Sequence, residues 1–205
     1  MCWNPDVSLS TFVFATAAIV IGYITRQHDL KWSVFYLSFA LMQLLEFFLW
    51  KNLTKPMVNK VFSLLGLLLI MLQPVAAGLL ITDSKYKPIY YALYAIWLVI
   101  YFMTSLPITL KTQKAPNGHL SWLWLKPSHG ILIATWLLFI IVAVCLSSIS
   151  TLAKAILTLT LAAFTYVSWW YYHNQQSTWG SVYCSFINLV FIVVIAKSFW
   201  SQYCR

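Results

Sequence analysis

The chain has 205 residues, of which 61% are hydrophobic and only 8% are charged. Because soluble domains carry about 25% charged residues, this composition excludes an ordinary soluble protein and favours one dissolved in lipid. Lys and Arg outnumber Asp and Glu by 13 to 4, but the cations are scattered singly between apolar runs. That scatter excludes a basic patch for nucleic acid and is typical of anchors at a membrane surface, so the expected partner is the lipid bilayer.

Seven apolar runs follow one another along the chain, each long enough for a helix that crosses the hydrocarbon core, which takes about 20 residues. They cover residues 7–25, 32–50, 58–81, 88–107, 130–148, 152–172 and 181–200. Most connections between them are short and polar, which predicts antiparallel neighbours. We therefore predict an all-α, multi-pass integral membrane protein. Residues 1–205 would form a single transmembrane domain, an up-and-down bundle of seven helices with its termini on opposite sides.

Two features depart from this regular pattern. The third run contains Pro74, which should kink its helix and leave a carbonyl for neighbouring helices to satisfy, because proline has no backbone N–H. The connection over residues 108–129 is longer than the others and is the only one large enough to act as a lid. It contains His119 and two tryptophans, Trp122 and Trp124, which we expect at the membrane interface.

Glu46 is the only acidic residue inside any of the seven runs. A carboxyl group within a membrane is costly and by default marks a functional site. Gln43, Glu46 and Trp50 are separated by steps of three and four residues, so they share one face of a helix. We predict that Glu46 is a catalytic acid or base and that Gln43 and Trp50 contact the substrate. The alternative is a hydrogen-bonded carboxyl that only ties helices together.

The alternating directions of the helices place most polar side chains in one half of the membrane. The second run ends in this half, the seventh run begins there, and the long connection also lies there. Ser181, Cys184 and Asn188 again step by three and four residues along one helix face. A polar half of this kind predicts a pocket open to one side and built around Glu46, Cys2 and Cys184. His119 would be a second catalytic residue there, and Ser181 and Asn188 would contact the substrate. The opposite half offers much less: Cys145, Cys204, His28 and Lys197.

The same half contains residue types that bind metal ions. Cys2, Cys184, Glu46 and His119 have the donor atoms that zinc or another divalent metal prefers, although no two of them show a known metal-site spacing. If this face is extracytoplasmic, Cys2 and Cys184 are equally suited to a disulfide. The third alternative is two free thiols. The sequence leaves these three alternatives open.

Three short stretches of the chain together resemble a known group of proteins. The stretches are residues 1–8 (MCWNPDVS), 43–50 (QLLEFFLW) and 179–184 (WGSVYC). They are similar to a family of small seven-helix membrane proteins of large DNA viruses, whose bacterial relatives begin Met-Cys-Phe-Ser-Ala and carry Gln-x-x-Glu-x-x-x-Trp in the second helix. The matching residues are Cys2, Gln43, Glu46, Trp50 and Cys184. The Trp-Cys pair of the family is Tyr183-Cys184 here, and His119 takes the place of its loop histidine. The resemblance implies the same site but no particular activity.

Three kinds of function fit these observations. The first is an intramembrane enzyme, with or without a bound metal ion, that acts on a lipid or small apolar substrate through Glu46. The second is a proton- or cation-coupled transporter or channel, with Glu46 as the protonatable group and the Gln73-Pro74 segment as the moving element. The third is a structural or partner-binding membrane protein. The sequence alone does not decide whether the chain is an enzyme.

Overall fold

The computed structural model describes residues 4–125, 130–172, 178, 180–181, 190–193 and 195. In chain order its elements are α1 (Pro5–Ile24), α2 (Leu30–Lys51), α3 (Pro56–Gly78), α4 (Tyr86–Ser105), β1 (Thr112–Lys114), β2 (Leu120–Trp122), α5 (Gly130–Cys145) and α6 (Thr151–Tyr172). These six helices coincide with the first six predicted runs to within three residues at every end. Most of the seventh run lies outside the described residues, so the count of seven helices and the sides of the two termini stay predictions.

The helices have the length and composition of membrane spans. Helices α1, α2, α3 and α4 and residues 151–170 of α6 are long and apolar enough to cross a membrane, and α5 includes a shorter apolar helix, Ile133–Cys145. Many large apolar side chains on these helices point outward, such as Met103, which is 76% exposed, and Leu159, which is 69% exposed. Water would disfavour so much apolar surface, but acyl chains would cover it. The described chain is mostly helical, so the predicted helical fold class is confirmed. The length and apolar surface of the helices suggest a membrane protein.

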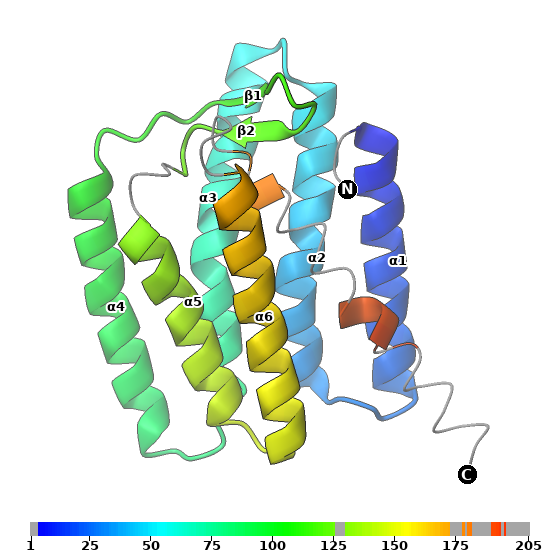
Figure 1. Cartoon of the computed structure of the whole chain (residues 1–205), viewed down its shortest axis with the longest axis vertical. Helices are drawn as coiled ribbons and strands as arrows, with labels where there is room; N and C mark the ends of the chain where they lie inside the picture. Colours follow the sequence, from blue (N-terminus) through cyan, green and yellow to red (C-terminus); the bar gives the residue numbers. More distant parts are fainter. Residues whose placement is uncertain are drawn as a thin grey trace.

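Helix α3 lies at the centre of the bundle and packs against α2, α4, α5 and the hairpin (Figure 1). Helices α1 and α2 form the most closely packed pair, and α6 packs more loosely against α5. In the α1–α2 pair Ala15, Ala18 and Gly22 of α1 are buried at steps of three and four residues. Small residues on one face let two helix backbones approach closely, which explains the tight contact between α1 and α2.

The proline in α3 is held by side chains of the neighbouring helices. The carbonyl left without a helical donor by Pro74 accepts a hydrogen bond of 3.0 Å from the indole nitrogen of Trp136 on α5. The hydroxyl of Tyr94 on α4 donates to Met71 O at 2.6 Å, and that of Tyr90 donates to Pro74 O at 2.7 Å. The prediction that neighbouring helices satisfy the freed carbonyl is confirmed.

The long connection contains a small antiparallel hairpin that the sequence analysis does not predict. Thr112 pairs with Trp122 and Lys114 pairs with Leu120. The turn passes through Gly118, whose φ of 83° lies in the left-handed region that glycine adopts without strain. Trp122 and Trp124 are each only 1% exposed and stack on one another with their ring centroids 5.0 Å apart. Both rings are therefore packed inside the protein and do not project outward. Their expected place at the level of the membrane interface stays a prediction.

Candidate functional site

The hairpin is fixed to the first turns of α3 by hydrogen bonds centred on Thr112. The side chain of Asn59 donates to Thr112 O and accepts from Thr112 N, both at 2.9 Å, so it pairs with β1 as a third strand would. The hydroxyl oxygens of Ser63 and Thr112 are 2.9 Å apart, and the indole of Trp124 donates to Thr112 Oγ1 at 3.0 Å. All of these partners are buried. These hydrogen bonds hold the hairpin as a cap on the first turns of α3, and a lid role for the long connection stays a prediction.

Two glycines make room for the two stacked tryptophans of this cap. A Cβ atom on Gly66 of α3 would lie 3.0 Å from Trp124 Cζ2, and one on Gly180 would lie 2.6 Å from two ring carbons of Trp122. The rings therefore lie directly against backbone on both sides. The hairpin thus joins α3 to the segment that carries the predicted substrate contact Ser181.

A second set of contacts connects this segment to His119. The amide of Asn117 donates to Thr178 Oγ1 at 3.0 Å, and its oxygen accepts from His119 N at 3.1 Å. His119 is 8% exposed, while Thr178 and Ser181 are fully buried. Burial lowers the pKa of the His119 imidazole, so the ring is neutral at pH 7 and one of its nitrogens is able to accept a proton. The structure thereby places predicted residues His119 and Ser181 at the same end of the bundle.

Glu46 and Gln43 lie on the buried face of α2, and both are 0% exposed. The hydroxyl of Thr11 on α1 donates to Gln43 Oε1 at 3.2 Å. Glu46 is five residues before the end of α2, about 8 Å by helix rise, and α2 ends at the same end of the bundle as the hairpin (Figure 1). Trp50, one turn further along, is half-buried. The chain has four acidic residues and Glu46 is the only buried one, because Asp6, Asp29 and Asp83 are exposed.

Three of the predicted site residues, Cys2, Cys184 and Asn188, lie outside the described residues. In the part of the chain that the structure describes, no three His, Cys, Asp or Glu side chains come together as a metal site. Glu46 and His119 are the two predicted ligands that are described. The zinc site and the disulfide between Cys2 and Cys184 therefore both stay predictions.

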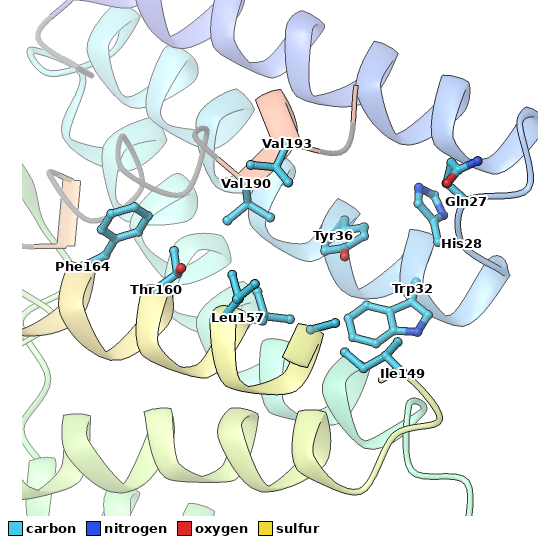
Figure 2. A pocket seen from close by; sticks show the side chains of 12 residues that line it. Gln27, His28, Trp32, Tyr36, Ile149, Leu157, Thr160, Phe164, Val190 and Val193 are labelled. Atoms are coloured by element: carbon cyan, nitrogen blue, oxygen red, sulfur yellow. The ribbon is translucent and has the colours of Figure 1, made fainter. Parts of the chain in front are cut away.

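A cavity of about 540 Å³ lies at the other end of the bundle. It opens between α2 and α6, beside residues 190–193, and His28 and Gln27 stand at one end of it (Figure 2). Sequence reasoning missed this place, because its apolar lining has the composition of any lipid-facing helix surface. A weak signal was present: Gln27 and His28 are followed at helical spacing by Trp32 and Tyr36, a polar pair beside an aromatic one.

No known protein family, characterised protein or solved structure matches this chain. The resemblance to viral membrane proteins accordingly rests on the three short motifs alone and stays a prediction. Function therefore has to be inferred from the burial, contacts and chemistry of the residues themselves.

Proposed function

We propose that the chain is a multi-pass integral membrane protein that acts on a lipid or other apolar molecule, with the Glu46 carboxyl as its acid or base. One observation carries this proposal: Glu46 is 0% exposed within α2, a helix long and apolar enough to cross a membrane. Burying a carboxyl group among apolar helices lowers stability, so its presence favours a chemical role. The amide of Gln43, one turn earlier on the same buried face, is suited to orient a polar group of the substrate.

The surroundings of Glu46 support this substrate class. The hairpin that caps this end is hydrogen-bonded to α3 through Asn59 and Ser63, which hinders access of a large polar molecule from the water side. The outer faces of α1 and α3 expose apolar side chains, such as Val13 and Leu72, to the surrounding solvent. A molecule dissolved in lipid would meet these faces first. His119, neutral through burial, would be a second proton carrier at this end.

The transporter alternative is weaker because its moving element is held in place. It requires the Gln73-Pro74 segment to swing. Four carbonyls of this segment accept hydrogen bonds from side chains of α4 and α5; they belong to Ile70, Met71, Pro74 and Val75. In addition, Gln73 Nε2 donates to Ser38 O of α2 at 3.3 Å. These hydrogen bonds oppose a swing of this segment.

The test follows lipid turnover by the purified protein. Wild-type protein in liposomes made from a total lipid extract is incubated, and substrates and products are followed by mass spectrometry. We expect turnover by wild type and by Asp83→Asn, which changes an exposed carboxyl, and none by Glu46→Gln. Proton flux that disappears in Glu46→Gln, without lipid turnover, would replace the proposal with a transporter. Neither activity, together with unfolding of Glu46→Gln, would leave a structural role.

A further inference from the structure

The cavity between α2 and α6 extends along one side of α6. Its α6 wall consists of residues 153, 156, 157, 160 and 164. Residues 153, 157, 160 and 164 step by four, three and four, so they share one face of the helix, and residue 156 lies next to them. From residue 153 to residue 164 the helix rises about 16 Å. Trp32 and Tyr36 of α2 stand opposite, with Val190 and Val193 between the two helices (Figure 2). The volume of about 540 Å³ falls within the usual range of small-molecule sites.

The two polar residues Gln27 and His28, in the connection between α1 and α2, lie together at one end of this cavity (Figure 2). The remainder is lined mostly by apolar side chains such as Leu157, Phe164 and Val190, and also by the hydroxyl-bearing Tyr36 and Thr160. His28 is held in place: its Nδ1 is 3.2 Å from Ser33 Oγ, and its ring meets that of Tyr36 edge to face at 5.4 Å. One polar end and one long apolar body match a molecule with one headgroup and one tail.

The charges beside the polar end favour an anionic headgroup. Three cations directly neighbour lining residues in the sequence: Arg26 precedes Gln27, Lys31 precedes Trp32 and Lys154 follows Ala153. The one acid among them, Asp29, accepts a hydrogen bond from Trp32 N at 3.1 Å and so caps α2. These four residues carry a net charge of +2. Because they lie where α1 ends and where α2 and α6 begin, they stand at the expected water boundary of the membrane, where a headgroup would lie.

We propose that this cavity binds a single-chain anionic amphiphile, such as a long-chain carboxylate, with its tail along α6 and its headgroup beside His28. Glu46 and Gln43 are not among the residues that line this cavity. Tyr36 is ten residues before Glu46 on α2, which is about 15 Å along the helix axis. The inference therefore goes beyond the proposed function and does not depend on it.

The test uses a dodecanoate that carries a photoreactive diazirine near the end of its tail. Purified protein in nanodiscs is labelled with this probe, and the labelled residues are mapped by peptide mass spectrometry. We expect labelling concentrated on residues 157–164 and 190–193. Unlabelled dodecanoate should compete for the site, and dodecyltrimethylammonium, a cation with the same tail, should not. Equal competition by the cation, or labelling spread evenly over the lipid-facing residues, would overturn the proposal.

Matched variants separate the cavity from the outer surface of the same helix. Leu157→Trp places a large ring in the cavity and should reduce labelling about tenfold, the result of 1.4 kcal/mol. Leu159→Trp adds the same ring two residues further on, at a side chain that is 69% exposed, and should leave labelling unchanged. Equal labelling of the two variants would contradict the proposal. Thr160→Phe fills the same cavity and serves as a second test if Leu157→Trp fails to fold.

A separate variant, Arg26→Asn, tests whether the headgroup of the ligand is anionic. Arg26 has a φ of 57°, and asparagine adopts this left-handed conformation more readily than most residues, so Arg26→Asn removes the charge with little backbone strain. Loss of one cation near a membrane surface should weaken dodecanoate binding about fivefold. Binding of the uncharged dodecanol should not change. A variant that loses both ligands equally would contradict an anionic headgroup at this end.

Discussion

The indole nitrogen of Trp136 on α5 donates a hydrogen bond to the carbonyl oxygen of Ile70 on α3, 3.0 Å away and one turn before Pro74. In a regular helix the N–H of residue 74 would occupy that oxygen, but proline has none. A side chain from another helix thus replaces a bond that the backbone of α3 lacks. The proline in α3 and the packing of α5 against this helix are consequently linked through one hydrogen bond.

Removing this donor should destabilise the bundle. Trp136→Phe leaves Ile70 O buried without that bond, and the loss of one hydrogen bond to a buried carbonyl is worth about 1–3 kcal/mol. We expect a lower unfolding midpoint in detergent micelles, followed by denaturant titration. Trp170→Phe, on a ring that is 58% exposed, is the control and should be close to neutral. In a Pro74→Ala background, where the helix regains its own donor, Trp136→Phe should have a smaller effect; an unchanged effect would argue against this pairing.

The side chain of Asn59 should determine whether the hairpin stays closed. Asn59→Leu removes two hydrogen bonds to the backbone of Thr112, each worth about 0.5–1.5 kcal/mol. The amide of Thr112 should then exchange with deuterium much faster, as measured on peptides that cover β1. Asn52→Leu is the control, because that amide donates only within its own region, to Phe48 O. Unchanged protection of Thr112 in Asn59→Leu would show that the hairpin is held by other contacts.

Gly180 should resist replacement even by alanine. A Cβ atom there would lie 2.6 Å from two ring carbons of Trp122, whose ring is buried and unable to retreat. Overpacking of this kind costs about 1–3 kcal/mol, only partly offset by roughly 1 kcal/mol of helix propensity. Gly66→Ala, with its nearest ring carbon at 3.0 Å, should be tolerated better. Thermal unfolding of the two variants gives the comparison, and Trp122→Leu should rescue Gly180→Ala.

Acidification should loosen the hairpin end through His119. Burial lowers the pKa of this imidazole in the folded protein, so the unfolded chain takes up its proton at a higher pH than the folded chain does. Stability is therefore complete at neutral pH and declines as pH falls below about 6.5, the ordinary histidine value. His119→Gln should remove this decline, seen as a flat unfolding midpoint between pH 7 and pH 5. Retention of the full decline in His119→Gln would assign it to another group.

The sequence by itself determined the helices and the face that carries the buried carboxyl. Runs of apolar residues predict α1 to α6, because a helix that crosses a bilayer needs a minimum length and apolar side chains that are stable in contact with lipid. The spacing of Gln43 and Glu46 predicts a shared helix face, and both are buried on one face of α2. The sequence also predicts that one carbonyl before Pro74 lacks a backbone donor within the helix, because proline has no N–H. These properties follow from residues close together in the chain.

Tertiary structure alone decided the donors, the cap and the cavity. The donor to Ile70 O is Trp136, which lies sixty-six residues later in the sequence. Its position depends on how α5 packs against α3. The strands of the hairpin are three residues long, too short for an alternating pattern, and their pairing depends on Asn59. Tryptophan occurs both at membrane interfaces and in packed cores, so residue type alone could not predict that Trp122 is buried. The cavity is lined by residues of α2 and α6 and by Val190, which are far apart in the sequence, so no local pattern in the chain encodes it.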